Sequence, residues 1–275
     1  MRCYAWEPEE RLFKDWIFRN LLGRRPSSHT IDEWRRVVKA VEYAVPLYES
    51  ISEAISLGFA GPLRRRAIRW LKGFKNGWTL DLGSGPGVST RLLVSNGFES
   101  VVGLDPSRKL LKFAKSNLGG RFHAIVGVAE SLPLRAETFN SILTCYALRD
   151  VRNLVQSLEE VSRVAKQEAG FAIVDVGKPD GTLRRCMVFL YVRFGMPVVS
   201  RLWTRGRLRT NPFRMIIPTF HWLVTNNMLR VIVEREFGPS ELNEYMLGGL
   251  VVLESTKAST GFVAAESRKK SQQTS

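Results

Sequence analysis

Cysteine and histidine are scarce in this 275-residue sequence. The three cysteines, Cys3, Cys145 and Cys186, lie far apart, which excludes a disulfide framework and a paired-cysteine metal site. Because there are only three histidines as well, we predict no metal centre. Cysteine usage of this kind is typical of a protein from a reducing cytosol.

Long apolar runs are also missing. Residues 1–25 mix charged side chains with isolated aromatics, so no secretory signal is expected. The longest apolar stretch, Cys186 to Ser200, contains Arg193 and Pro197 and is shorter than the ~20 residues that span a bilayer. We therefore expect a cytoplasmic protein that is not integral to a membrane. A hydrophobic content of 44% excludes a largely disordered chain.

Acidic residues are few compared with basic ones, 26 against 41, and the net charge of +15 favours a polyanionic partner such as nucleic acid or an anionic membrane surface. The excess is uneven: residues 1–78 carry +6, residues 79–180 carry +1 and residues 181–275 carry +8. Gly181 to Val233 holds nine arginines and no acid. This distribution predicts a nearly neutral core with basic surfaces around it, although a solvated arginine-rich face is the plainer interpretation.

Short apolar strands alternate with helical patterns through the middle of the chain. This alternation predicts βαβ units and an α/β, Rossmann-like fold, with helices on both faces of a mostly parallel seven-stranded sheet that ends in an antiparallel hairpin. The expected strands are 78–82, 101–105, 122–128, 141–146, 171–176, 242–246 and 250–255, and the expected helices between them include 89–95, 106–117 and 150–165, the last capped by Asp150.

Two helices are expected before the first strand. Thr30 and Glu33 have the capping-box spacing that predicts a helix start. Pro62 opens a helix that runs through Trp70, with its four arginines expected on the outer side, namely Arg64, Arg65, Arg66 and Arg69. We divide the chain into an N-terminal helical extension over 1–40, a main domain over 41–256 with an arginine-rich helical insertion at 178–237, and a disordered tail over 257–275.

A glycine-rich loop, Gly83-Ser84-Gly85-Pro86-Gly87, follows the first expected strand, where doubly wound sheets bind their ligands. A phosphate-binding loop is excluded because no Gly-Lys-Ser/Thr closes it. A dinucleotide loop has its third glycine where this chain has Val88, and Asp81 is poorly placed beside a pyrophosphate.

Asp81 instead favours a cationic ligand. S-adenosylmethionine carries a sulfonium and an ammonium group and no phosphate, and the glycines allow the backbone to approach it closely. Asp105, which ends the second strand, can accept both ribose hydroxyls. Nicotinamide binders use a similar spacing between loop and acid, so the spacing alone does not separate the two ligands. The acid before the loop favours S-adenosylmethionine over a nicotinamide cofactor and over an unliganded turn.

Several segments together resemble a known family. Residues 80–87, 103–107 and 129–134 follow the motif order of class I methyltransferases. Tyr146–Val151 resembles the "FGLRNV" stretch of the ubiquinone/menaquinone-biosynthesis C-methyltransferases, and residues 45–49 and 246–251 resemble their "AxxYD" helix and "LTGGIVA" hairpin. The resemblance covers roughly residues 41–256.

The resemblance implies a site for S-adenosylmethionine and a methyl acceptor. Val128 stands where the family carries an acid near adenine, so adenine recognition is assigned to the backbone of Ala129 and to Glu130. Arg149, Tyr48 and Asp150 would orient a water or a phenolate, with water or Asp150 taking the proton. The cofactor-binding residues are expected to be Asp81, Gly83, Ser84, Gly85, Gly87, Asp105, Pro106, Ala129, Glu130 and Tyr146.

The family methylates a ring carbon of a polyprenyl quinol precursor, so the resemblance implies a lipophilic small-molecule acceptor. The insertion would form a lid whose arginines meet anionic headgroups, which predicts a peripheral position at the inner face of a membrane. Its apolar side chains would suit a prenyl chain, namely Met187, Phe189, Leu190, Tyr191, Phe194, Met196 and Val198.

Three alternatives remain open: an RNA methyltransferase that uses the basic surface, a methyltransferase of another small molecule, and a non-catalytic binding protein. Other candidate residues are weaker. Cys145 and His123 lie in expected strands and are interpreted as packing residues, and His221 is a lone histidine among aromatics. Asn211-Pro212-Phe213 lacks the second proline of the amino-methyltransferase signature.

Overall fold

The computed structural model describes residues 35, 38–39, 41–43, 45–118, 120, 122–204, 219–220 and 223–259. The capping box at Thr30, the Asn211–Phe213 segment, His221, nearly all of the expected extension and the tail from residue 260 lie outside the described residues.

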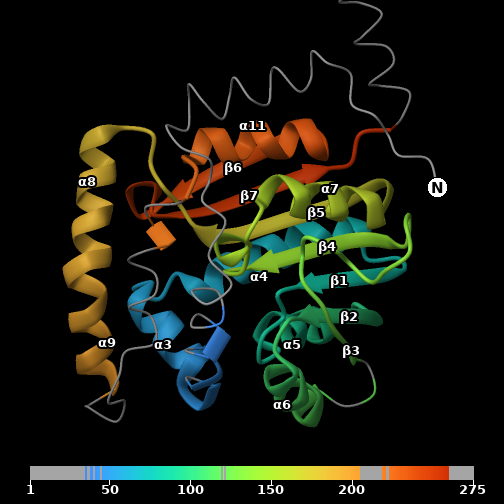
Figure 1. Ribbon diagram of the computed structural model, residues 1–275, viewed down its shortest axis with the longest axis horizontal. Coiled ribbons are helices and arrows are strands. Elements are labelled where there is room, and N and C mark those ends of the chain that lie inside the picture. The colour runs from blue at the N-terminus through green and yellow to red at the C-terminus, as the bar shows by residue number, and fades with distance from the viewer. Residues whose placement is uncertain are drawn as a thin grey trace, which may run out of the picture.

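Seven strands form one sheet in the order β3-β2-β1-β4-β5-β7-β6 (Figure 1). The first five pair in parallel, whereas β7 is antiparallel to both β5 and β6. The predicted α/β Rossmann-like fold with its closing hairpin is confirmed. The strands are β1 (Trp78–Leu82), β2 (Ser100–Asp105), β3 (Phe122–Val126), β4 (Phe139–Cys145), β5 (Ala165–Val176), β6 (Ser240–Tyr245) and β7 (Leu250–Thr256).

Helices cover both faces of this sheet (Figure 1). They are α3 (Tyr48–Ile55), α4 (Ala60–Leu71), α5 (Val88–Ser95), α6 (Arg108–Leu118), α7 (Leu154–Val164), α8 (Thr182–Leu190), α9 (Met196–Thr204) and α11 (Asn226–Glu236). Two expected boundaries were wrong by more than two residues. β5 begins six residues earlier than the expected Phe171. The cap of α7 is Asn153, whose side chain accepts from the Gln156 N–H, and not Asp150, which lies in a short 3-10 turn.

The alternation of side chains along the strands divides the core into two layers. One face packs against α3, α4 and α5, and the other packs against α7 and α11. The first layer includes Ile51, Leu63, Ile68, Leu93, Leu143, Ala172 and Val174. The second includes Leu80, Leu104, Ile142, Leu158, Val161, Ile173, Leu229 and Val233.

One arginine of α4 contradicts the expected outer side. Arg64 is 2% exposed, whereas Arg65 and Arg69 are exposed. The reason is helical spacing: Arg64 falls four residues after buried Ala60 and four before buried Ile68, on the stripe that faces the sheet. Apolar neighbours on that stripe fix the rotation of the helix and carry Arg64 inward.

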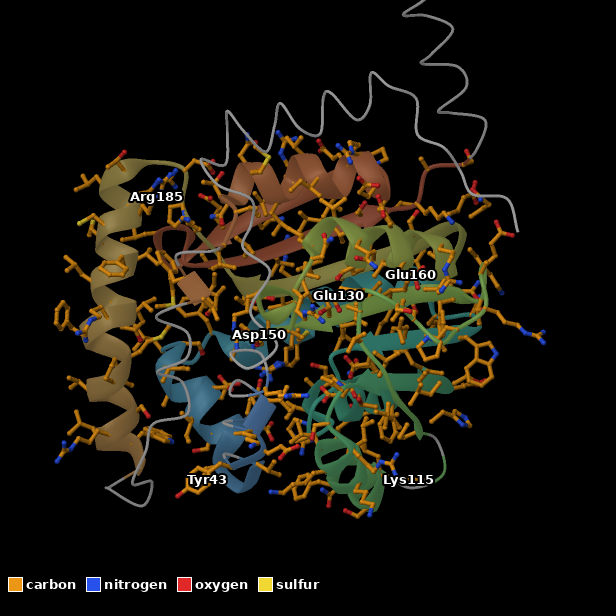
Figure 2. The ribbon with its side chains drawn as sticks, viewed as in Figure 1. Tyr43, Lys115, Glu130, Asp150, Glu160 and Arg185 are labelled. Carbon is orange, nitrogen blue, oxygen red and sulfur yellow. The ribbon has the colours of Figure 1, made fainter. Side chains whose placement is uncertain are left out.

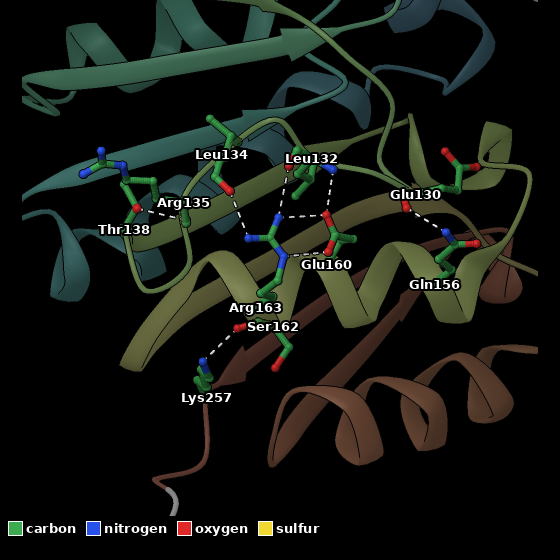
Figure 3. A network of polar contacts seen from close by, with 10 residues as sticks. All are labelled: Glu130, Leu132, Leu134, Arg135, Thr138, Gln156, Glu160, Ser162, Arg163 and Lys257. Atoms are coloured by element: carbon green, nitrogen blue, oxygen red, sulfur yellow. Dashed lines mark hydrogen bonds and ion pairs between the residues drawn. The ribbon is translucent and has the colours of Figure 1, made fainter. Parts of the chain in front are cut away.

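The loop between β3 and β4 is tied to α7 by a polar network (Figure 3). Arg163 donates to the carbonyl oxygens of Leu132 and Leu134, and Glu160 accepts from the Leu132 N–H at 2.7 Å. Gln156 donates to the Glu130 carbonyl at 2.9 Å. These contacts hold the loop as one wall of the cavity described below.

The segment after β5 forms a long helix along one edge of the molecule (Figure 1). α8 passes through a π turn at Tyr191–Gly195 into α9. Tyr191 Oη donates to the Ile55 carbonyl at 2.7 Å and Trp203 Nε1 donates to Ser50 Oγ at 2.6 Å, so α3 holds this helix at two points.

The apolar stretch Cys186–Ser200, expected to be too short to cross a bilayer, lies inside a longer helix. Thr182–Trp203 is a continuous helical segment of 22 residues, and an 18-residue window within it has a mean hydropathy of 1.2, so by length and composition alone it could span a membrane. Pro197 does not break the helix, because the wider π turn directly before it accommodates the missing N–H.

Candidate cofactor and acceptor site

The glycine loop after β1 adopts backbone angles that side chains resist. Gly83 and Gly87 have φ values of +71° and +86°, and a Cβ on Gly83 would lie 2.2 Å from the Cβ of Ala147. A Cβ on Gly85 would meet no heavy atom within 4 Å, so this part of the loop borders open space. The loop therefore needs glycine at Gly83 for close packing, while at Gly85 it leaves room beside the backbone.

Asp81 lies behind this loop, buried at 1% exposure. Its Oδ2 accepts a 2.6 Å hydrogen bond from Thr90 Oγ1, whereas its Oδ1 has no hydrogen-bond partner. Burial raises the pKa of this carboxyl to about 7, against the lowering effects of Thr90 and Arg64. A cation near Oδ1 would relieve the cost of that burial.

Asp105 ends β2 beside the loop. Its Oδ2 accepts from the Gly85 N–H at 2.9 Å and its Oδ1 accepts from the Ser107 N–H at 2.8 Å. Burial raises its pKa to about 6, although both backbone donors lower it. Ser107 Oγ in turn donates to Glu42, which joins the residues before α3 to this edge of the site. Each carboxylate oxygen retains lone pairs for ligand hydroxyls.

The end of β4 carries backbone strain. Tyr146 has φ +59°, an uncommon value for an aromatic residue, and its N–H donates to the Val174 carbonyl at 2.7 Å. The strained turn directs the chain into Ala147–Asp150, the segment that faces the glycine loop. The hydroxyl of Tyr146 is buried and has no hydrogen-bond partner.

A cavity of about 120 Å³ lies between these elements. It brings together most of the predicted cofactor residues with all three predicted catalytic ones, whereas the predicted residues Asp81 and Gly87 do not line it. The predicted residues that line it are Tyr48, Gly83, Ser84, Gly85, Asp105, Pro106, Ala129, Glu130, Tyr146, Arg149 and Asp150. Figure 2 shows Asp150 between α3 and the sheet, with Glu130 nearby.

Buried polar atoms without partners gather at this cavity. Within the described residues such atoms occur on Arg64, Ser84, Thr144 and Tyr146, which line it, on Asp81 behind it, and elsewhere only on Arg66. Since buried polar groups are nearly always hydrogen-bonded, their concentration here indicates a site completed by a polar ligand.

Glu130 has a structural contact besides its place in the cavity wall. Its Oε1 accepts from the backbone N–H groups of Arg152 and Asn153, at the start of α7. One carboxylate oxygen thus stabilises a helix start.

Arg149 is held between two carboxylates. Its guanidinium lies 3.5 Å from Asp150 Oδ1 and 3.5 Å from Asp175 Oδ1, and its backbone N–H donates to Asp175 Oδ2. The two acids raise its pKa against the effect of burial, so it keeps its charge. Sequence reasoning missed Asp175, a single acid in the apolar run of β5, and its position at the carboxyl end of that strand was the available signal.

A second cavity of about 430 Å³ adjoins the first and is lined mainly by apolar side chains. Tyr48, Tyr146 and Arg149 line both cavities. From the lid helix, Met187, Val188, Tyr191, Val192 and Met196 line the second cavity. The predicted apolar face of the insertion is therefore divided, because Leu190, Phe194 and Val198 face outward and are exposed.

Two of the weaker candidates have packing roles. Cys145 is a buried free thiol, and burial raises its pKa to about 12, which removes it as a nucleophile at neutral pH. The ring of His123 packs on Trp78 with 5.3 Å between centroids. Among the residues that the structure describes, no group of three His, Cys, Asp or Glu side chains could hold a metal ion.

Comparison with known proteins agrees with this geometry. A methyltransferase-domain family model matches residues 80–173. The ubiquinone/menaquinone biosynthesis C-methyltransferase UbiE of Geotalea daltonii is 25% identical over 181 residues, 63% of this chain and 77% of that protein. The 2-phytyl-1,4-naphtoquinone methyltransferase of Nostoc punctiforme is 31% identical over 165 residues, 57% of this chain and 72% of that protein. The plantazolicin methyltransferase BpumL, solved with S-adenosylhomocysteine, shares the fold with a TM-score of 0.54 and 14% identity, covering 82% of this chain and 96% of its own.

The strand order, the glycine loop and the two buried acids define an α/β enzyme that binds a nucleoside cofactor at the carboxyl edge of its sheet. Methyl transfer is the activity common to the matching family and the relatives. The chain belongs to the class I S-adenosylmethionine-dependent methyltransferases, and its relatives include the ubiquinone/menaquinone-type C-methyltransferases.

Proposed function

We propose that this enzyme methylates a ring carbon of a prenylated quinol precursor. The observation that carries the proposal is the apolar 430 Å³ cavity, which adjoins the cofactor cavity at Tyr48, Tyr146 and Arg149. A quinol ring near these three side chains would leave its apolar tail among Met187, Val192 and other lid residues. The names of the relatives, which act in quinone biosynthesis, support the same acceptor class.

S-adenosylmethionine, when bound, supplies an electrophilic methyl group. Asp105 would accept from the ribose hydroxyls, and the loop at Gly83–Gly85 would approach the cofactor closely. Val128 and Ala129 line the cavity beyond Asp105, and the backbone there would meet the adenine. The protein supplies position more than chemistry, because a correctly oriented carbon nucleophile needs little further activation.

The chain's own contribution to the chemistry is charge and proton transfer at the acceptor oxygen. Arg149, permanently protonated between Asp150 and Asp175, would stabilise the phenolate that forms beside the reacting carbon. Burial raises the pKa of Asp150, so this carboxyl, or a water next to it, could take the phenolic proton. Once the ring carbon carries the methyl group, its hydrogen would leave as a proton and the oxygen would be reprotonated, so one proton is lost overall. Burial raises the pKa of Tyr48, which keeps its hydroxyl protonated as a donor.

We further propose that the enzyme works at an anionic membrane surface. Leu57, Met187 and Leu247 line the apolar cavity and are 56%, 48% and 52% exposed, so they form an apolar mouth to it. The outer side of the lid helix continues this surface with Leu183, Leu190, Phe194, Val198 and Leu202. Residues 181–204 carry four arginines and no acid, a pattern that suits an interfacial helix on anionic lipid.

An assay with labelled S-adenosylmethionine and either total lipid or total RNA extract tests the acceptor class. We expect label in the lipid fraction, and faster labelling of a chemically reduced polyprenyl naphthoquinol in detergent than of its quinone, because only the reduced ring has an ionisable hydroxyl. Arg149→Lys should lower this rate strongly while the affinity for S-adenosylhomocysteine stays unchanged. Label in RNA alone, or equal rates on quinol and quinone, would overturn the proposal.

A further inference from the structure

Arg64 is a buried charge with two nitrogen atoms that make no hydrogen bond. The side chain is 2% exposed, and its Nε and Nη1 atoms have no hydrogen-bond partner. Within the described part of the chain it forms no ion pair, and its guanidinium carbon lies over the Tyr146 ring, 4.7 Å from the ring centroid. Burial lowers the pKa of this guanidinium, but nearby groups that include Glu53 raise it above its usual value, so Arg64 keeps its charge. Its Nε and Nη1 atoms still lack the hydrogen bonds that a buried guanidinium needs, which suits an anionic ligand.

The guanidinium faces the cofactor cavity. Arg64 is one of the residues that line it, and it does not line the adjoining apolar cavity. The two cavities share Tyr48, Tyr146 and Arg149, so the charge that meets the acceptor is that of Arg149. The position of Arg64 therefore points to the cofactor.

A second buried charge with an unsatisfied atom lies close by. Asp81 Oδ1 also has no hydrogen-bond partner, and the charge of Arg64 lowers the pKa of this carboxyl. The two groups influence each other but form no ion pair. A positive and a negative side chain that do not pair with each other suit a ligand that carries both charges, because each side chain can bind the ligand group of opposite charge.

The amino-acid end of S-adenosylmethionine is such a ligand, since it carries an ammonium and a carboxylate on one carbon. Ser89, at the start of α5, contacts the Cys145 thiol, and the charge of Arg64 acts on the same thiol. The positive end of the α5 dipole therefore lies beside this region. We propose that Arg64 binds the α-carboxylate of S-adenosylmethionine while Asp81 faces its ammonium group. The inference rests on the cofactor and not on the acceptor proposed above.

The test compares ligands with and without the carboxylate. Purified protein is titrated calorimetrically with S-adenosylmethionine and with decarboxylated S-adenosylmethionine, which keeps the ammonium and the sulfonium. We expect the wild type to bind the decarboxylated ligand at least about tenfold more weakly, the size of a lost charge-assisted contact. Arg64→Met should bind both ligands with nearly equal affinity. Arg65→Met, the exposed neighbour on the same helix, should keep the wild-type ratio.

Arg64→Lys keeps the charge with a single-point contact, and should give an intermediate ratio. If Arg64→Met does not fold, the ratio of the two ligand affinities in the wild type and in Arg64→Lys still tests the proposal. A wild type that binds the two ligands equally, or an Arg64→Met variant that keeps the full preference, overturns the proposal. So does an Arg64→Met variant with unchanged cofactor affinity and a raised KM for the acceptor. A protein that fails to methylate quinols would leave these ratios intact, so the two proposals fail separately.

Discussion

The backbone N–H of Gly85 donates a 2.9 Å hydrogen bond to Asp105 Oδ2, so the glycine loop after β1 is fixed to the acid that ends β2. The loop N–H groups of Gly83 and Ser84 also donate to the Leu104 carbonyl, one residue earlier. The acid therefore has two roles: it holds the loop in place and presents oxygens to the ligand.

Asp105→Asn should weaken binding of S-adenosylhomocysteine by at least about tenfold, because an amide has one acceptor oxygen where the carboxylate has two. The NH2 group of the asparagine would then face the backbone N–H of Gly85 or of Ser107, so two donors would meet. Isothermal titration measures the change, with Glu99→Gln, at an exposed position before the other end of β2, as the control. A variant with wild-type affinity would show that Asp105 does not contact the ligand.

Cofactor affinity should rise with pH. Burial raises the pKa of Asp81 to about 7 and that of Asp105 to about 6, so both are partly protonated in the ligand-free protein at mildly acidic pH. A cation and donating hydroxyls favour the ionised carboxylates, so binding lowers both pKa values and releases protons. Affinity should increase through pH 6 to about 7 and then level off.

The same raised pKa values act on folding with the opposite sign. A carboxyl whose folded pKa is raised contributes stability below its unfolded pKa and loses it as pH rises through the folded value.

Calorimetry in buffers of different ionisation enthalpy measures the protons released when the cofactor binds, and Asp81→Asn should remove the part of that release centred near pH 7. A dissociation constant independent of pH between about 5.5 and about 7.5 would contradict the assignment.

Asp175→Asn should reduce kcat more than it changes the KM for the cofactor. Asp175 touches Arg149 through both the guanidinium and the backbone N–H, so it is a positioning residue for the arginine proposed to meet the acceptor oxygen. We expect kcat to fall by about tenfold or more and stability to fall by about 1–3 kcal/mol, as for a buried hydrogen-bond partner removed.

Steady-state kinetics and urea unfolding measure these two effects. Glu168→Gln, an exposed position on the same strand, serves as the control. Equal losses in kcat and in affinity for S-adenosylhomocysteine would instead place Asp175 in general support of the cofactor site.

Phe194→Glu should weaken binding to vesicles of phosphatidylglycerol and phosphatidylcholine. Phe194 is 59% exposed on the outer side of the lid helix, and losing the burial of one such ring costs about 1.5–3 kcal/mol, or tenfold and more in partitioning. Vesicle co-sedimentation at low and physiological salt measures it. Phe113→Glu, an exposed phenylalanine on α6, is the matched control, and equal effects of the two substitutions would exclude the lid as the docking face.

The cofactor half of the site was predictable because its features are local. Asp81, the glycine loop and Asp105 each follow a strand with an unmistakable apolar pattern, and parallel strands bring their carboxyl ends to one edge. The mostly parallel sheet and its closing hairpin followed from the same alternation, whereas the order of the strands came only from the structure. The N-cap of α7 was misassigned because Asp150 and Asn153 are both favourable N-cap residues. In the structure Asp150 pairs with Arg149, and Asn153 caps the helix.

The sequence by itself determined which residues meet the loop, because strand period, glycine conformation and motif order act over short distances. Only the tertiary structure decided which way single charges face. Arg64 looks like one of four outward arginines until α4 is rotated by its apolar neighbours, and Asp175 has no visible partner until β5 lies beside β4. The lid shows the same principle, since only contact with α3 divides its apolar residues between a cavity and an exposed face. The direction of a side chain depends on the elements packed against it, and these come from distant parts of the chain.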